Sequence, residues 1–411
     1  MSGVFRGWRV VGGAFAVTFL GFGAAYTFSA FVGPLQAEFG ATRGSVSLVF
    51  SLAGFLYFGL GVLTGPLADR WGARPLAVIG MILTGAGLAV AGAARSLDEV
   101  YAAYGLGVGV GVGCAYVPAL GAVQRWFVRR RGLASGLAVS GIGVGTLVMP
   151  PLASWLIESI GWREAYLALG AFAAVIGGGL ALLIESEPSR RGLAPDGDSP
   201  GLDAPSAGAA GASVLEAVRS RRFIGLYTAC LICSFGLFVP FVHLAPFALD
   251  LGVAPASAVL LLGVIGVGST AGRFLLGSLA DRMGRAPTLL VMFAGMAVAL
   301  LVWVFATDWW SLAVFAFAYG GFYGGFVAVL PALVMDYFGG RNVSAIIGIL
   351  YTSVAFGTLI GPAAAGFAFD VSHSYTVPIL ASVVANLLAA VAMAGTSKER
   401  GGRFGAPTQQ A

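Results

Sequence analysis

One arginine inside a long apolar segment is the residue of this chain with the clearest capacity for chemistry. Arg273 lies in the run 266–275, eight residues before Asp281, which marks the end of that segment. At a helical rise of ~1.5 Å per residue, it sits ~12 Å inside an apolar layer that is ~30 Å thick in a membrane. A guanidinium at that depth costs at least ~2.5 kcal/mol, so it needs a polar cavity or a partner.

The acidic residues offer Arg273 no partner at the same depth. Each of the 18 carboxylates falls at the end of an apolar segment or in a loop. An anion that binds from solution would explain such an arginine, and the forked guanidinium suits a carboxylate. A structural arginine that snorkels or is solvated by water is the alternative. Because one cation lies at this depth, the sequence favours a monoanion.

A few polar and aromatic side chains on other apolar segments would complete such a site. They are sparse, which favours a small, rather apolar pocket for a short organic acid over a sugar site. For each of them alone, packing or interface anchoring is the alternative role. Besides Arg273, the residues that we expect to bind substrate are Tyr26, Cys114, Tyr116, Ser269, Tyr323, Phe326 and Tyr351.

One of the two histidines, His243, lies in an apolar segment, toward its outer end. An unperturbed imidazole titrates near neutral pH. Two interpretations stay open: a gate residue or proton carrier, and a hydrogen-bonded histidine at a helix end without a part in transport.

The composition indicates which elements position these residues. Of 411 residues, 58% are hydrophobic and 10% are charged, whereas soluble proteins carry about 25% charge. We expect an all-α polytopic membrane protein with twelve transmembrane helices in two pseudo-symmetric six-helix bundles. The expected segments are 9–34, 45–67, 76–95, 99–124, 133–158, 164–184, 223–249, 255–279, 287–306, 309–336, 343–368 and 375–395. The first bundle covers 1–184, a cytoplasmic linker 185–221, and the second bundle with a short tail 222–411.

The linker and the arginines indicate how the chain lies in the membrane. The turn-rich run 194–201 and the Ala/Gly/Ser tract after it favour a flexible connection. Of the 23 cations, nineteen fall on the side of both termini and three on the other, namely Arg43, Arg95 and Arg163. Cytoplasmic loops carry excess Lys and Arg, so we expect cytoplasmic termini in the cell inner (plasma) membrane. The sequence contains no basic run interleaved with aromatic residues, so nothing in it suggests nucleic-acid binding.

Other motifs favour packing over chemistry. Cys114, Cys230 and Cys233 lie in apolar runs, so we expect buried packing residues and not a redox or metal site. The glycine run 105–113 has the spacing of a close-packing helix face and lacks the Lys-Ser/Thr end of a phosphate loop. The sequence contains no ATP-binding motif, so we expect the protein to draw its energy from a concentration gradient across the membrane. We expect no cofactor and no metal.

A short loop motif occurs twice, at equivalent points of the two halves. Residues 65–75 and 277–287 share the pattern G-x-L-x-D-R-x-G-x-x-P. We expect its charges to form a conformational latch; an orientation signal alone is the alternative. The residues concerned are Asp69, Arg70, Arg74, Asp281, Arg282 and Arg285. This repeat resembles the loops between helices 2 and 3, and 8 and 9, of major facilitator transporters, in which the substrate site lies near the midplane between halves.

The run 126–145 and the opening Gly7-Trp8-Arg9 resemble signatures of monocarboxylate transporters and their oxalate/formate-exchanger relatives. The resemblance implies proton-linked carriage of lactate- or pyruvate-like anions, with Arg273 at the position that grips the carboxylate. Two positions depart from it: Ser269 stands where many members have Asp, and 350–356 lacks the Lys of oxalate exchangers. The proton would then travel on His243 or on the substrate carboxyl.

We therefore expect a monomeric carrier of small monocarboxylates, coupled to protons and working by alternating access in the lipid bilayer. A carrier or exchanger of another organic anion (oxalate- or formate-like) or of a drug on the same fold is the alternative. A membrane enzyme would need convergent His, Asp or Cys groups, and a sensor would usually add a soluble signalling domain. The sequence shows neither, so we expect no enzyme.

Overall fold

The chain folds into a bundle of long helices. The computed structural model describes residues 5–127, 131–197, 211–339 and 342–397. In this part, twelve helical spans are long and apolar enough to cross a membrane, from Gly7–Phe39 to Thr376–Gly395. The prediction of an all-α polytopic membrane protein with twelve transmembrane helices is confirmed, and the expected boundaries hold to within a few residues.

The first half contains six of these spans, four of which consist of more than one helical piece. They are α1 (Gly7–Tyr26) with α2 (Phe28–Phe39), α3 (Arg43–Gly59) with α4 (Gly61–Trp71), α5 (Ala73–Gly92), α6 (Leu97–Val100) with a π-helical stretch (Tyr101–Val108) and α7 (Gly109–Trp126), α8 (Arg131–Ile160), and α9 (Trp162–Phe172) with a second π-helical stretch (Ala173–Gly177) and α10 (Gly178–Ala181).

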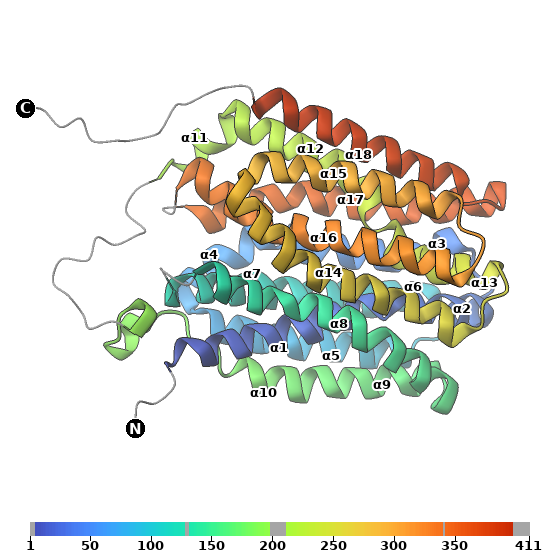
Figure 1. Cartoon of the computed structure of the whole chain (residues 1–411). Helices are drawn as coiled ribbons and strands as arrows, with labels where there is room; N and C mark the ends of the chain where they lie inside the picture. Colours follow the sequence, from blue (N-terminus) through green and yellow to red (C-terminus); the bar gives the residue numbers. More distant parts are fainter. Residues whose placement is uncertain (1–4, 128–130, 198–210, 340–341, 398–411) are drawn as a thin grey trace, which may run out of the picture.

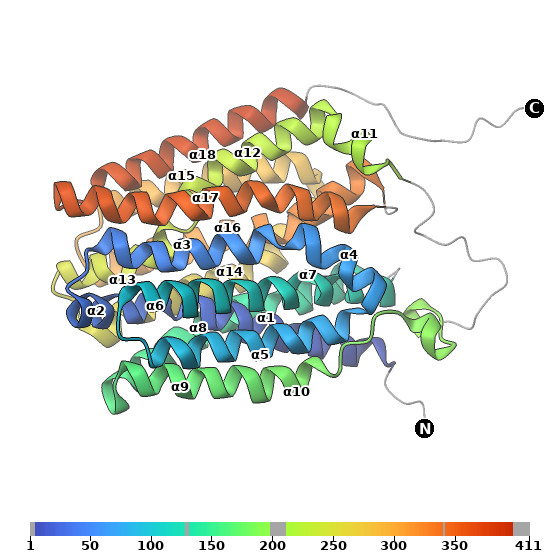
Figure 2. The ribbon, with the colours of Figure 1, turned by 180° about the vertical axis from the view of Figure 1, so that it is seen from behind.

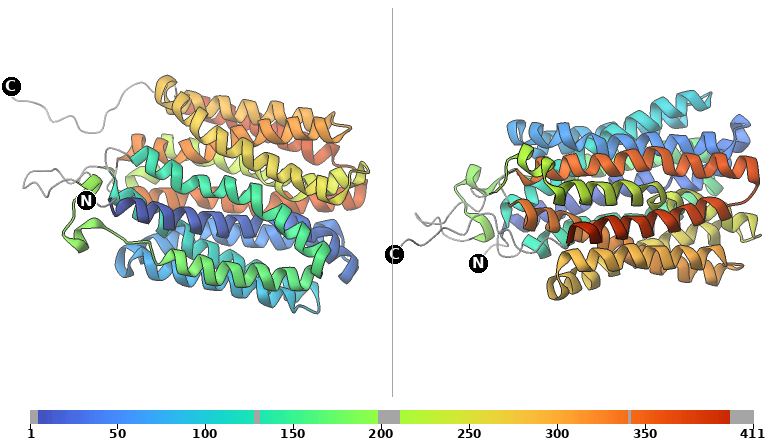
Figure 3. Two further views of the ribbon diagram at one scale, coloured as in Figure 1. Left: turned by 60° about the horizontal axis from the view of Figure 1, so that its bottom comes forward. Right: turned by 90° about the horizontal axis from the view of Figure 1, so that it is seen from above.

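The second half repeats the six-span plan. Its helices are α12 (Arg221–Leu237) with α13 (Val239–Asp250), α14 (Pro255–Met283), α15 (Arg285–Val304), α16 (Trp309–Phe338), α17 (Val343–Ser372) and α18 (Thr376–Ser397). Figure 1 shows the first half below the second, and Figure 2 shows the same order from behind. In both views of Figure 3 the helices lie roughly along one common axis.

Two seams join the halves, α3 against α17 and α8 against α14. The chain enters α1 and leaves α18 at the same end of the bundle, which we call the termini end (Figure 1). At the opposite end, α3 begins at Arg43 and α17 ends at Ser372; we call it the Arg43 end.

The first span extends five residues beyond its expected end at Pro34. Helix α2 includes this proline and continues to Phe39. It ends where Gly40 adopts a φ of 58°, a left-handed conformation that glycine adopts without steric cost. The glycine, and not the proline, therefore ends the span.

The first span of each half is interrupted near mid-membrane, at Thr27 and at Phe238. A tyrosine from the fourth span of the same half bonds to the backbone beside each break. Tyr104 Oη donates to the carbonyl of Ala25 at 2.9 Å, and Tyr319 Oη donates to the carbonyl of Leu237 at 2.7 Å. Backbone carbonyls without a helical partner need such donors in a membrane, so the tyrosines stabilise the two breaks.

The glycine run that opens the fourth span forms two packing faces, as the sequence indicates. A β-carbon on Gly107 or Gly111 would run into α5, at Gly87 or at Thr84 and Gly80. Glycines 105, 109 and 113 would meet α3 instead, at Leu52, Ala53 and Leu56. Small residues thus let three helices approach closely.

Both described ends of the linker contact the halves. Its first part bonds to the first half, since Trp126 Nε1 donates to the carbonyl of Glu185 at 2.8 Å. Its last part pairs with the second half, since the Ala212 amide donates to the Phe338 carbonyl at 2.9 Å. The short helix α11 (Val214–Arg219) follows, with a capping box of Ser213 and Glu216. These contacts hold the described ends of the linker against the two halves, and the expectation of a flexible connection over 194–201 and the Ala/Gly/Ser tract stays a prediction. Residues 198–210 lie outside the described part.

Candidate functional site

Arg273 lies in the second half of α14, ten residues before its last residue Met283, on the seam with α8. Its side chain is buried, at 4% exposure. Nε, Nη1 and Nη2 have no hydrogen-bond partner among the residues that the structure describes. A buried guanidinium with unpaired donors is rare, because each unpaired group loses its hydration without compensation. It is suited to receive an anion.

Four phenols lie within electrostatic range of the Arg273 guanidinium: Tyr26, Tyr116, Tyr323 and Tyr351. They come from α1, α7, α16 and α17, so both halves contribute. Tyr26 Oη and Tyr323 Oη are 3.1 Å apart and form a hydrogen bond across the halves. The structure therefore gathers four of the expected substrate residues around Arg273.

A small aromatic cavity adjoins this cluster between the halves. Its volume is about 20 Å³, room for one water molecule, which needs about 10–15 Å³, and too small for an organic acid. The residues that line it are Phe22, Phe58, Tyr116, Ile142, Leu237, Phe238, Tyr323, Phe326, Val327, Leu330, Tyr351 and Val354. Phe326 thus lines the cavity beside the Arg273 cluster, and this conformation leaves no room there for an organic acid.

Ser269 and Cys114 take less defined places. Ser269 is one helical turn before Arg273 on α14, and its buried hydroxyl has no partner in the described part of the chain. Cys114 is half-buried on α7 and does not line the cavity. Ser269 can therefore offer a hydrogen bond beside Arg273, whereas nothing places Cys114 in the site.

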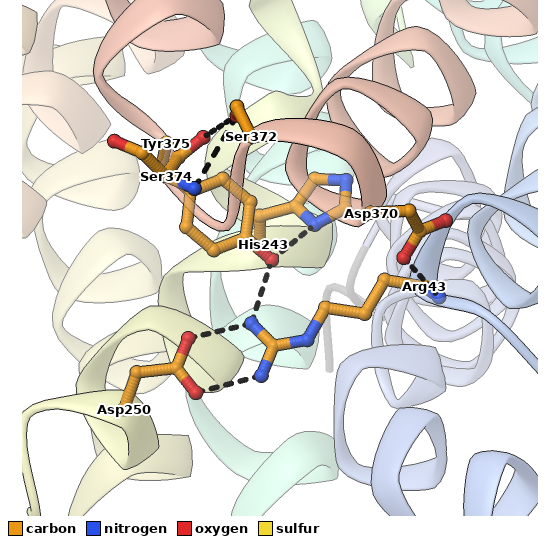
Figure 4. Close-up of polar contacts among 7 residues, drawn as sticks. All are labelled: Arg43, His243, Asp250, Asp370, Ser372, Ser374 and Tyr375. Atoms are coloured by element: carbon orange, nitrogen blue, oxygen red, sulfur yellow. Dashed lines mark hydrogen bonds and ion pairs between the residues drawn. The ribbon is translucent and has the colours of Figure 1, made fainter.

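A second cluster closes the Arg43 end. Arg43 Nη1 and Nη2 bind Asp250 at 2.6 and 2.7 Å, in a two-pronged ion pair between α3 and α13. Asp370 of α17 accepts the Arg43 and Gly44 amides at 3.0 and 2.9 Å. The guanidinium also lies 4.1 Å from the ring centroid of Phe369. Figure 4 shows Arg43 with Asp250 and Asp370. They tie the first half to the second.

His243 belongs to this second cluster and is buried in it. Nε2 lies 2.8 Å from the carbonyl oxygen of Pro362, which can only accept, so Nε2 carries a proton. Nδ1 lies 3.1 Å from Tyr375 Oη, which also accepts a 3.0 Å hydrogen bond from Arg43 (Figure 4). Burial raises the pKa of Tyr375 to about 12, so the phenol keeps its proton at neutral pH and donates it to Nδ1. His243 is a satisfied, neutral link in a chain from Arg43 to α17.

Comparison with known proteins identifies the family. The family model described as Major Facilitator Superfamily matches residues 14–265 and 224–408. The chain belongs to the major facilitator superfamily. It is 34% identical to mouse (Mus musculus) monocarboxylate transporter 11, over 91% of this chain and 83% of that one. It is 30% identical to zebrafish (Danio rerio) monocarboxylate transporter 12-B, over 90% and 82%.

A solved structure supports the same fold. A bacterial homolog of the human lysosomal transporter Spinster, described as inward-facing and unoccupied, superimposes with a TM-score of 0.70 at 19% identity, covering 97% of this chain and 98% of its own. This major facilitator chain is therefore a multi-pass membrane transporter and not an enzyme, and the family and fold expectations are confirmed.

The expected latch of this major facilitator chain stays a prediction. Arg74 Nε donates to the carbonyl of Ile184 at 2.9 Å, within the first half. Arg285 binds Asp336 and the Ala332 carbonyl, within the second half. Arg70 and Arg282 are exposed, and the side chains of Asp69 and Asp281 lie outside the described part. The contacts that the structure does show tie these loops to their own halves.

Sequence reasoning missed two groups of this major facilitator protein. Tyr57 of α3 is buried with a hydroxyl that has no partner among the described residues, and it lies in electrostatic range of Tyr26. In the sequence Tyr57 stands in an apolar run and therefore has no polar neighbours that would mark it as a site residue. Arg43 was counted only as an outer cation; its complement, acidic residues at two other helix ends on the same side, was the available signal.

Tyr323→Phe should loosen the contact between the halves without removing the cation of the site. A neutral hydrogen bond contributes about 0.5–1.5 kcal/mol, so the form closed at the Arg43 end should lose about two- to tenfold in population. Distances between spin labels on the two halves would measure this. Tyr227→Phe, whose hydroxyl bonds to Thr352 within its own half, is the control and should leave that distribution unchanged.

Proposed function

We propose that this protein carries small monocarboxylate anions across the membrane by alternating access, with Arg273 binding the carboxylate. The observation that supports it most is a buried guanidinium with three unpaired nitrogens between the halves. An anion would supply the missing acceptors through two parallel hydrogen bonds. The names of the monocarboxylate transporters at about 30% identity point to the same chemistry.

The same surroundings favour a short acid with a single charge. One cation faces four neutral phenols, so a second carboxylate would find no positive partner in the described site. The aromatic cavity walls offer apolar contact to a short side chain. Because the Arg43 end is closed by the Arg43 cluster and the cavity is too small for an acid, we propose that the anion enters from the termini end once the halves have separated there. From the arginine distribution we propose that this end is cytoplasmic, in the plasma membrane, and that the carrier works as a monomer.

We infer proton coupling from the chain of hydrogen bonds through His243. Because Nε2 already donates to Pro362, an added proton binds at Nδ1. The imidazolium then has two donors, and the Tyr375 hydroxyl can no longer donate to it. Protonation would therefore reverse this hydrogen bond, leave the Tyr375 O–H without its present acceptor and place a second cation near Arg43. Transfer of the proton on the substrate carboxyl beside Arg273 is the alternative route.

His243→Gln tests this role, because a glutamine amide can still donate to the Pro362 carbonyl but binds no proton near neutral pH. We expect uptake of labelled lactate into proteoliposomes to lose its stimulation by an inward proton gradient. Exchange of lactate at equal pH on both sides should persist. Stimulation that stays intact in His243→Gln would assign the proton to the substrate carboxyl. The exposed His373, as His373→Gln, is the control.

Uptake of labelled lactate by the wild type tests the function itself. Uptake that depends on the proton gradient supports the proposed symport. Absence of lactate uptake together with uptake of oxalate, formate or another organic anion would replace the substrate class. Absence of uptake for a broad panel of anions would overturn the assignment of Arg273 to substrate binding.

A further inference from the structure

The guanidinium of Arg273 lies against bare backbone of the opposite half, at Gly143 of α8. A β-carbon added at Gly143 would lie 3.0 Å from Arg273 Nη1 and 3.1 Å from the carbonyl oxygen of Gly266, and it would overlap Thr270 Oγ1. No side chain larger than hydrogen fits there without displacing these atoms. Gly143 thus leaves the space that the guanidinium occupies.

The neighbouring glycines of α8 serve a different contact. A β-carbon on Gly145 would meet the carbonyl of Phe19 at 2.5 Å and Gly23 at 3.2 Å, both on α1 of the same half. Gly141 also faces α1, at Phe15 and Thr18. Gly136 has open space around it. Packing within the first half therefore accounts for Gly141 and Gly145 but not for Gly143.

The contact at Gly143 exists only while α8 and α14 lie together. A β-carbon on Gly266 of α14 would meet the Leu147 amide at 2.5 Å and the Gly143 carbonyl at 2.6 Å, so the two backbones nearly touch. The carbonyl of Gly143 nevertheless accepts no hydrogen bond from Arg273, whose nitrogens have no partner among the described residues. The first half restrains the guanidinium sterically and leaves its donors unused.

We propose that Gly143 is a positioning residue for Arg273: it fixes where the guanidinium meets the substrate carboxylate without competing for its hydrogen bonds. This rests on the proposed role of Arg273 in anion binding. A misplacement of about 1 Å can cost about 100-fold in a geometrically demanding site. A β-carbon at 3.0 Å requires a smaller shift, so we expect Gly143→Ala to raise the KM for lactate about tenfold.

The test compares three single variants in α8 by lactate uptake and thermal unfolding. Gly136→Ala should match the wild type in both. Gly145→Ala should lower the amount and stability of folded carrier but leave KM unchanged, because its clash stays within the first half. Gly143→Ala should raise KM. An unchanged KM in Gly143→Ala, or an equal rise in Gly145→Ala, would overturn the proposal.

Thr270→Ala separates packing from positioning. It removes Oγ1, the atom that the new β-carbon would overlap most closely, and leaves the contact with Arg273. In Gly143→Ala with Thr270→Ala, stability should therefore recover while KM stays raised relative to Thr270→Ala alone. If KM recovers together with stability, Gly143 acts only through packing.

A measurement without substrate keeps this proposal distinct from the proposed function. Phenylglyoxal modifies accessible arginines, and mass spectrometry of peptides reports the rate at Arg273 alone. We expect slow modification in the wild type and a several-fold faster rate in Gly143→Ala, with Gly136→Ala unchanged. Faster modification in a carrier that transports no anion would leave the positioning intact and reject the function. An unchanged rate would reject the positioning, whatever is transported.

Discussion

Arg273→Ala should reduce lactate uptake into proteoliposomes about 100-fold or more. The proposed pair of charge-assisted hydrogen bonds to the carboxylate contributes about 1.5–3 kcal/mol for each bond, and 1.4 kcal/mol corresponds to about tenfold. Arg273→Lys keeps the charge and loses the fork, so it should retain about a tenth of the wild-type kcat/KM. Uptake across a range of lactate concentrations measures both.

The thermal stability of Arg273→Ala should not fall together with its uptake of lactate. A guanidinium at mid-membrane depth costs at least ~2.5 kcal/mol when it has no partner, and the buried Arg273 has none among the described residues. We therefore expect Arg273→Ala to unfold at the same or a higher temperature than the wild type. Arg95→Ala is the control for a surface cation and should change neither property. Uptake by Arg273→Ala at the wild-type rate would remove Arg273 from the substrate site.

Arg43→Ala should open the Arg43 end of the carrier. The variant loses the two-pronged ion pair to Asp250, the hydrogen bond to Tyr375 and the contact with the Phe369 ring. Hydrogen bonds to charged groups contribute about 1.5–3 kcal/mol. The closed population at this end should fall about 10- to 100-fold, which spin-label distances between the exposed positions 98 and 307 would detect.

Arg163→Ala provides a matched control for this experiment. Arg163 also binds a carboxylate, Glu38, at 2.8 Å, and it lies 4.2 Å from the ring of Trp162. Both contacts stay within the first half. If Arg43→Ala and Arg163→Ala shift the distance distribution equally, the Arg43 cluster is a surface ion pair and not a closure between the halves.

The parts of this structure that could be predicted from sequence depend on local composition. Twelve spans follow from hydropathy, and Arg273 is visible because a cation in an apolar run needs an explanation. The phenols around it could be named but not assembled, since Tyr26 and Tyr323 are 297 positions apart. Arg43 and Asp250 are separated by 207 positions, and ordinary charges at helix ends give no sign of pairing. Cys114 is selected as a polar residue in an apolar segment, but it does not line the cavity, so polarity alone does not identify site residues.

The two interrupted spans carry a mechanical consequence. Since the breaks at Thr27 and Phe238 each have a tyrosine hydroxyl bonded to the backbone beside them, we expect α2 and α13, of 12 residues each, to pivot separately from α1 and α12. By contrast, α8, α14, α16 and α17 are uninterrupted helices of 29 or 30 residues. A local rotation of α2 and α13 moves fewer lipid-facing side chains than a tilt of a whole half does. The first opening at the Arg43 end should therefore be sensitive to Tyr104→Phe and Tyr319→Phe and almost insensitive to bilayer thickness.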